Sequence, residues 1–140
     1  MQQLTQEILR LCREYGECRV EAERMEEARR VKNALESVCS MARQRLDISD
    51  PALLLALLDA CEVTRDEGML QEVLDVVGRN LDRLAVSVES VKLLACCYYY
   101  VEEEECAERA RRMLEELRKM GRRIGGCGDN FGGIDLRFRL

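Results

Sequence analysis

Apolar residues recur at steps of three and four along most of this chain, and that spacing places them on one side of an α-helix. The pattern divides into six segments, which we expect to be helices at about 2–15, 20–46, 51–64, 66–84, 88–101 and 103–120. A single proline among 140 residues leaves little to interrupt these helices. We therefore predict an all-α protein.

The third segment, "PALLLALLDAC", has the clearest helix start in the sequence. Asp50 can cap this helix, and Pro51 at its first position sacrifices no hydrogen bond. Leucines lie on nearly every side of it, which predicts that it is covered on more than one side and forms the centre of the domain. We also expect Ser87 to cap the fifth helix, Gly16 to interrupt the first and Gly121 to end the sixth.

The chain changes character after Gly121. The stretch "GRRIGGCGDNFGG" holds six of the nine glycines and lacks the Gly-Lys-Ser/Thr ending of a phosphate-binding loop, so it is interpreted as a linker. In the last segment, apolar and charged residues alternate, as is typical of a strand; the apolar ones are Ile134, Leu136, Phe138 and Leu140. We predict a helical domain at 1–121, a Gly-rich basic linker at 122–133 and an extended, β-like segment at 134–140.

Charge divides the chain in nearly the same place. Residues 118–140 carry six Lys or Arg and two Asp or Glu, a balance of +4, whereas residues 1–117 carry 16 and 25, a balance of −9. The longest uncharged run, Leu93 to Val101, is nine residues, and a membrane-spanning helix needs about 20. We expect a soluble protein of the cytoplasm or of another reducing compartment, such as an organelle matrix.

The cysteines and the absence of histidine bear on catalysis. All eight cysteines avoid CxxC spacing, and most lie within apolar periodic stretches, so we expect free, buried thiols. Without histidine, Ser–His and Cys–His nucleophile systems are impossible within the chain, and no spacing indicates a four-thiol zinc site. We predict no catalytic residues, no cofactor, no metal and no small-molecule substrate.

The middle of the chain contains an internal repeat. At an offset of 36 residues, Leu57, Leu58 and Cys61 align with Leu93, Leu94 and Cys97, and the apolar residues that follow also align. A period in the mid-thirties built of helical hairpins resembles the tetratricopeptide and pentatricopeptide repeat families, best over residues 50–121. The stretches "LLDAC" and "ARRMLEELRKMG" favour the pentatricopeptide family, although the repeat-ending proline and the Trp–Leu–Gly signature are missing. The resemblance implies three antiparallel hairpins stacked as a short right-handed array, with partners on its concave face.

The run Glu102–Glu105 is interpreted as a helix start. Consecutive helical residues point in directions about 100° apart, so these carboxylates cannot converge on one ion, and acidic residues favour a helix N-terminus. We expect Glu105 to pair with Arg109, and Glu108 with Arg112, along an exposed side. Tyr99 and Tyr100 lie beside small residues and are candidate partner contacts, with packing against the neighbouring hairpin as the alternative.

The C-terminal residues supply the other candidates. An apolar strand face cannot stand alone in a helical protein, so it should pair with a partner's sheet edge or lie in a groove. The full set of candidate partner-binding residues is Tyr99, Tyr100, Arg122, Arg123, Phe131, Ile134, Leu136, Arg137, Phe138 and Arg139. The arginines and phenylalanines of this set could also contact RNA, but the acidic body would repel phosphate and no convincing pair of base-reading side chains is present.

We therefore predict a non-enzymatic adaptor or assembly subunit that binds protein partners within a larger assembly. The alternative is a pentatricopeptide-like, RNA-associated subunit of an organellar ribonucleoprotein complex.

Overall fold

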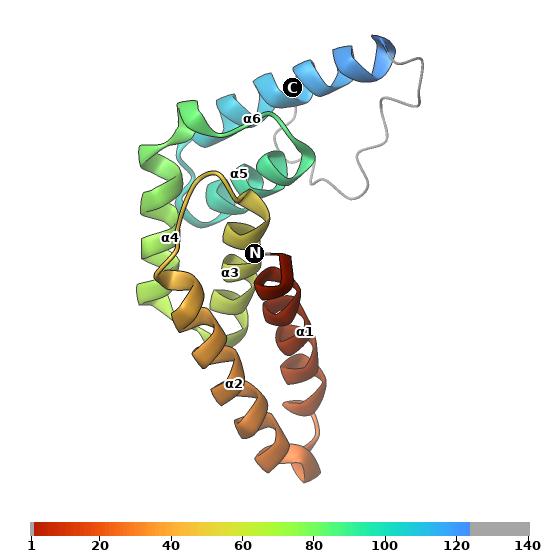
Figure 1. Ribbon diagram of the computed structural model, residues 1–140, viewed down its shortest axis with the longest axis vertical. Helices are drawn as coiled ribbons and strands as arrows, with labels where there is room; N and C mark the ends of the chain where they lie inside the picture. Colours follow the sequence, from red (N-terminus) through yellow and green to blue (C-terminus); the bar gives the residue numbers. More distant parts are fainter. Residues whose placement is uncertain (1, 124–140) are drawn as a thin grey trace.

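The computed structural model describes residues 2–123 as a set of helices (Figure 1). The six α-helices are α1 (Gln2–Cys18), α2 (Met25–Arg43), α3 (Pro51–Thr64), α4 (Glu67–Arg79), α5 (Val88–Val101) and α6 (Glu104–Arg123). Two short 3₁₀ turns, η1 (Ala22–Arg24) and η2 (Leu81–Arg83), lie in the connections. The prediction of an all-α fold is confirmed for these residues, and the strand expected at 134–140 lies outside them.

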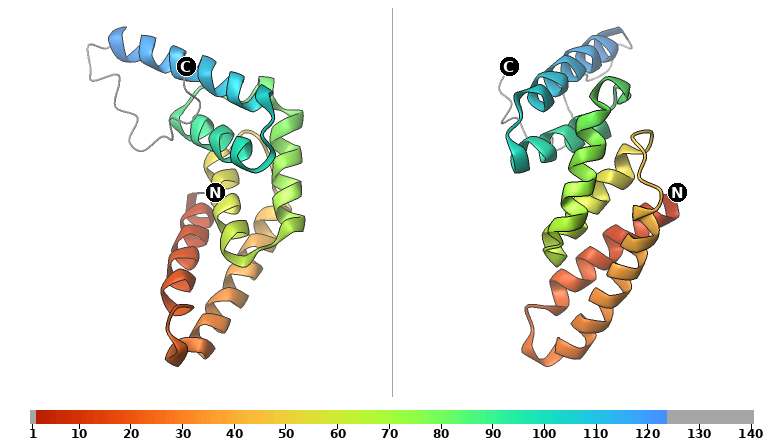
Figure 2. Two further views of the ribbon diagram at one scale, coloured as in Figure 1. Left: turned by 180° about the vertical axis from the view of Figure 1, so that it is seen from behind. Right: turned by 90° about the vertical axis from the view of Figure 1, so that its left-hand side faces the viewer.

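The helices pack as three pairs that follow one another along the long axis of the molecule (Figures 1 and 2). α1 packs on α2, α3 on α4, and α5 on α6. The odd-numbered helices connect the pairs, because α3 contacts both α1 and α5. α3 also contacts α2, and α4 contacts α5.

The sequence of α3 explains its central position. Asp50 accepts a hydrogen bond from the Leu53 amide at 3.2 Å, and Pro51 follows at the first helical position, as predicted. Helices lie against several sides of α3, and its buried residues are Leu53, Leu54, Ala56, Leu57, Leu58, Ala60 and Cys61. Burying a leucine side chain contributes about 2 kcal/mol, so this one helix supplies a large share of the hydrophobic stabilisation.

Two glycines do not act as expected from the sequence. Gly16 lies inside α1, which continues to Cys18, and Gly121 lies inside α6, which continues to Arg123. Arg122 and Arg123 are therefore helical rather than part of the linker predicted from residue 122. A glycine inside a helix costs only about 1 kcal/mol relative to alanine, and the packing of the remaining residues of each helix offsets that cost.

Two other helix boundaries differ from the prediction. α2 covers only the middle of the expected segment 20–46, because residues 22–24 form the turn η1. α4 ends at Arg79, where the Asn80 side-chain amide donates to the Val76 carbonyl at 2.7 Å. Leu81 and Leu84, expected on this helix, lie after its end; Leu84 nevertheless is buried.

The structure also corrects the offset of the repeat from 36 to 37 residues. α3 and α5 both contain 14 residues, and their starts, Pro51 and Val88, are 37 residues apart. α4 and α6 begin at Glu67 and Glu104, with the same separation. At this offset, buried residues coincide along both helix pairs; examples are Leu54 with Val91, Leu57 with Leu94, Ala60 with Cys97, Met69 with Cys106 and Val73 with Ala110. An offset of 36 aligns more identical residues than an offset of 37. Because leucines lie on nearly every side of α3, however, identical residues do not determine how α3 aligns with α5.

Candidate interaction face on α3 and α5

The start and the end of α5 determine where Tyr99 and Tyr100 lie on this helix. Ser87 caps the helix as predicted, with its hydroxyl accepting from the Ser90 amide at 3.1 Å. At the other end Glu102 adopts a left-handed conformation with φ of 51°, and its amide donates to the Tyr98 carbonyl at 2.7 Å. Because the helix ends there, Tyr99 and Tyr100 lie in its last turn.

The two candidate tyrosines have different environments. Tyr100 is half-buried, and its hydroxyl donates to Glu62 Oε2 of α3 at 2.5 Å. Burial and then this hydrogen bond raise the pKa of Tyr100. Tyr99 is 56% exposed, and its ring meets that of Tyr100 edge to face, with centroids 5.3 Å apart. Tyr100 thus bridges two helices, whereas Tyr99 presents an aromatic ring at the surface.

The 37-residue offset identifies the surface to which Tyr99 belongs. At this offset Tyr99 corresponds to Glu62, Cys96 to Asp59 and Lys92 to Leu55, and all six side chains are at least partly exposed. They lie at equivalent positions of two helices that pack directly on each other, and we group them as one surface. We call it the α3–α5 face; it consists of Leu55, Asp59, Glu62, Lys92, Cys96 and Tyr99.

A small cavity lies at the edge of this face. It has a volume of about 240 Å³ and is lined by Cys61, Glu62, Arg65, Asp66, Glu67, Leu70 and Tyr100. Its charged lining residues are three acids and one arginine; one of the acids, Asp66, also pairs with Arg43 of α2 at 3.7 Å. Nearby, partial desolvation and then the Glu62 carboxylate raise the pKa of Asp59. The α3 side of the face therefore favours a positively charged group.

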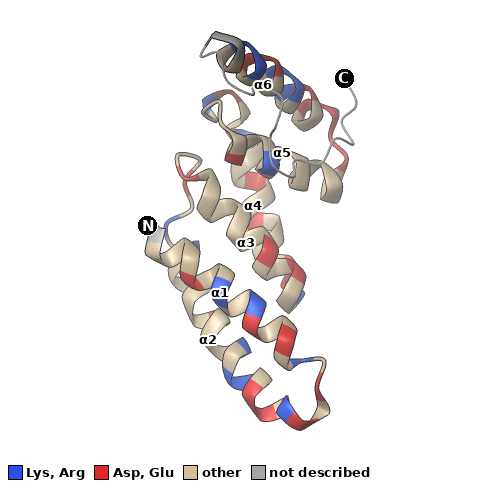
Figure 3. Cartoon of the chain, turned by 90° about the vertical axis from the view of Figure 1, so that its right-hand side faces the viewer, with Lys and Arg blue, Asp and Glu red and all other residues tan. Residues whose placement is uncertain are grey.

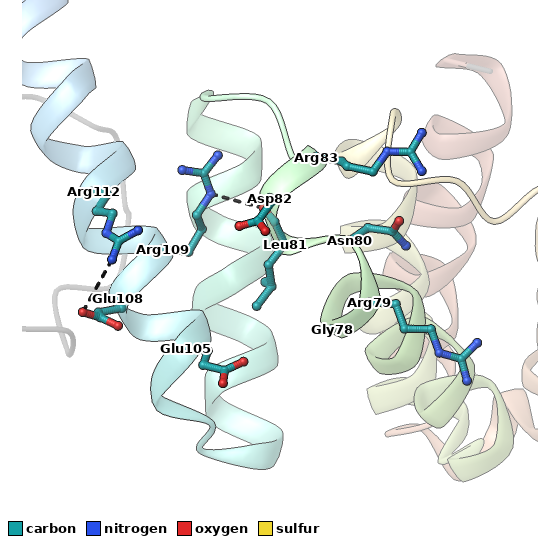
Figure 4. Close-up of a pocket in the computed structure, with 10 residues that line it drawn as sticks. All are labelled: Gly78, Arg79, Asn80, Leu81, Asp82, Arg83, Glu105, Glu108, Arg109 and Arg112. Carbon is teal, nitrogen blue, oxygen red and sulfur yellow. Dashed lines mark hydrogen bonds and ion pairs between the residues drawn. The ribbon is translucent and has the colours of Figure 1, made fainter.

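A second groove separates the end of α4 from α6 (Figure 4). Its volume is about 460 Å³, and its charged lining residues are Arg79, Asp82, Arg83, Glu105, Glu108, Arg109 and Arg112. In Figure 4 the side chains of Arg79 and Arg83 point away from α6. Charges of both signs line the groove, and its arginines do not converge on one point, as binding of a phosphate group would require.

Arg109 of this groove has a structural role that the sequence did not indicate. Its guanidinium donates to the carbonyls of Leu81 and Leu84, at 3.2 and 3.1 Å. The pair predicted between Glu105 and Arg109 is therefore wrong, because Arg109 turns to the α4–α5 connection. The predicted pair of Glu108 with Arg112 is present at 3.8 Å. Every residue has a backbone carbonyl, so the sequence does not indicate which carbonyls an arginine will bind.

The glutamate run straddles the connection between α5 and α6. Glu102 ends α5, Glu103 forms the turn, and Glu104 begins α6. All four glutamates are exposed, so the interpretation as an acidic helix start holds for the last two of the run.

The thiols lie mostly in the core. The seven described cysteines are free, and all except Cys96 are buried. Burial raises the pKa of Cys12 to about 11 and those of Cys39 and Cys61 to about 12. Among residues 2–123, no three cysteine, aspartate or glutamate side chains are grouped so that they could hold a metal ion. Buried, protonated thiols of this kind are poor nucleophiles.

The remaining candidate residues lie at the C-terminus. Arg122 and Arg123 form the last residues of α6, but their side chains are not described. The rest of the candidate set lies outside the described residues: Phe131, Ile134, Leu136, Arg137, Phe138 and Arg139. The structure thus brings Tyr99 and Tyr100 together on α5 and leaves the C-terminal candidates as sequence predictions.

Within the described residues, none of the helices combines the length and the apolar character that crossing a membrane requires. Comparisons with protein-family models, with curated proteins and with solved structures found no match to this chain.

Proposed function

We propose that this chain is a non-enzymatic adaptor or assembly subunit that holds a protein partner on the α3–α5 face and with its C-terminal segment. In this proposal the three helix pairs are hairpins of a short right-handed array of the tetratricopeptide or pentatricopeptide type. The order of the pairs, the contacts of α3 with both α1 and α5, and the 37-residue recurrence of caps and buried positions support it. The α3–α5 face is then the concave side, where such arrays bind partners.

The observation that carries the proposal is the exposure of Tyr99. A tyrosine buries a large area on binding at a low cost in conformational entropy, and tyrosines are enriched among the residues that dominate interface energies. The ring of Tyr99 is also held in place, because it packs edge to face on Tyr100, and Tyr100 is bound to Glu62. A rigid, exposed aromatic ring beside carboxylates suits a partner segment that carries both apolar and basic residues.

Replacing Tyr99 tests this proposal. We expect Tyr99→Ala to reduce the amount of partner recovered by affinity purification from the native source by tenfold or more, since a central interface aromatic contributes about 2 kcal/mol. Leu9→Ala is the matched control, because Leu9 is also an exposed apolar residue (41%) but lies on α1. The proposal is wrong if both variants recover the same proteins in the same amounts as the unmodified chain.

A further inference from the structure

Two buried thiols lie on either side of the connection between α5 and α6. Cys97 belongs to α5 and Cys106 to the first turn of α6, and their exposed fractions are 1% and 2%. The two residues of the connection, Glu102 and Glu103, are exposed, and Figure 3 shows acidic residues, in red, at this connection. The proposed adaptor role uses neither thiol.

The buried sides of α5 and α6 bring these two thiols close together. α6 packs chiefly on α5, so its buried residues point toward α5, and Cys106 is one of them. Burial raises the pKa of Cys97, and three neighbouring groups raise it further. These groups are Cys106, Cys96 and Glu103, and none of them belongs to α3. Cys97 therefore points toward α6 rather than toward α3.

The two thiols also lie at nearly the same height in the helix pair. Because only two residues connect α5 to α6, the helices run antiparallel, and the end of α5 lies beside the start of α6. Cys97 lies four residues before Val101, the last residue of α5. Cys106 lies two residues after Glu104, the first residue of α6. The difference of two residues shifts the thiols by about 3 Å along the helix axes.

This geometry fits a disulfide. The axes of packed helices are about 8–10 Å apart, and Cα atoms lie about 2.3 Å from each axis. Two Cα atoms that face each other with the shift given above are therefore about 4.5–6 Å apart. A disulfide joins Cα atoms about 4.4–6.8 Å apart. At the equivalent positions the second helix pair has Ala60 and Met69, which are also buried, so only the third of these two pairs carries a thiol on both helices.

We propose that Cys97 and Cys106 form an intramolecular disulfide when the chain reacts with a low-molecular-weight disulfide. One thiolate attacks a sulfur of the oxidant and releases one thiol, and the second thiolate then attacks the mixed disulfide and releases another. The two cysteines together lose two protons and two electrons, which reduce the oxidant to two thiols. The new bond ties α5, which carries Tyr99, to α6. This inference goes beyond the proposed function, because the reaction concerns the chain alone.

Because both thiols are buried, the reaction requires the connection between the helices to open. Burial raises the pKa of Cys106 as it does that of Cys97, so both thiols are protonated in the closed chain. Both lie within about one turn of the exposed connection, and helix ends open more readily than the centre of a core. The oxidant therefore reaches these thiols without unfolding of the whole chain.

Mass spectrometry of the full chain, treated at neutral pH with oxidised mercaptoethanol, tests the proposal. This oxidant is uncharged, so the glutamates of the connection do not repel it. A glutamate-specific protease cleaves within Glu102–Glu105, between the two cysteines, and a disulfide then leaves two peptides linked. We expect this linked pair to be the first disulfide to appear, in a monomer that has lost the mass of two hydrogen atoms. Fragmentation of the linked peptides distinguishes Cys97 from Cys96 in the unmodified chain.

Cys97→Ala and Cys96→Ala are matched variants at adjacent positions of α5. The first should lose the linked pair and the second should keep it, with circular dichroism verifying that both remain helical. The oxidised chain should also unfold at a higher urea concentration than the reduced chain, because a disulfide restrains the unfolded state. The proposal is overturned if another disulfide forms first, if Cys97→Ala keeps the linked pair or Cys96→Ala loses it, or if oxidation does not raise the urea midpoint.

Discussion

Cys39 of α2 and Cys61 of α3 are each 4% exposed, and burial raises the pKa of both to about 12. The sequence predicted buried thiols of this kind, because the cysteines replace apolar residues in helical periodicity. It could not predict which tyrosine would be exposed, since that depends on the bond of Tyr100 to Glu62, 38 residues away. The type and spacing of the cysteines thus predict that they are buried, whereas the hydrogen bond between Tyr100 and Glu62 can be seen only in the structure.

The raised thiol pKa values make stability depend on pH. In the unfolded chain a thiol has its ordinary pKa, near 9, and ionises, while the buried thiol stays protonated until about pH 12. Each buried thiol therefore contributes fully to the free energy of unfolding below pH 9, and this contribution is lost as the pH rises from 9 toward 12. We expect urea denaturation at pH 10 to give a free energy of unfolding lower than at pH 8 by about 1 kcal/mol for each such thiol. In Cys61→Ala this loss should be smaller by the contribution of one thiol; an unchanged loss would contradict the account.

At the scale of helices, the sequence correctly predicted the features that depend on neighbouring residues alone, such as capped helix starts. The caps Asp50 and Ser87 gave the starts of α3 and α5 correctly, because a side-chain oxygen that accepts from the third amide along is a local signal. The helix ends predicted at Gly16 and Gly121 were wrong, because packing along the rest of each helix outweighs the cost of one glycine. The repeat offset was wrong by one residue for a related reason, since caps and buried positions determine the register of an apolar helix.

The attachment of α6 to the α4–α5 connection gives a prediction for Arg109. We expect Arg109→Ala to lower the free energy of unfolding by about 2 kcal/mol, because two hydrogen bonds from a charged donor are lost and the Leu84 carbonyl loses its partner, whereas the Leu81 carbonyl still accepts from the Leu84 amide. Urea denaturation measures the change. Arg112→Ala is the control on the same helix; its exposed pair with Glu108 contributes only about 0.5 kcal/mol. Equal effects of the two substitutions would show that Arg109 does not hold the connection.

The whole molecule has a helical body, residues 2–123, which includes four of the six basic residues of 118–140, and a following segment, residues 124–140, which carries two Arg and two Asp. The central position of α3 was predictable, because a helix that is apolar on nearly every side must be covered on several sides. The hydrogen bond from Tyr100 of α5 to Glu62 of α3 was not predictable, because the two residues are 38 positions apart. The proposed adaptor role joins the two parts: the body presents the face, and the segment after α6 supplies basic and apolar residues.

Deletion of residues 128–140 tests this division most directly. The deletion removes none of the described helices, so we expect the circular dichroism signal at 222 nm to remain that of the full chain. The account predicts that affinity purification from the native source with the truncated chain then loses the partner recovered by the full chain, by tenfold or more. A truncated chain that keeps its helical signal and recovers the same partner in the same amount would contradict the account.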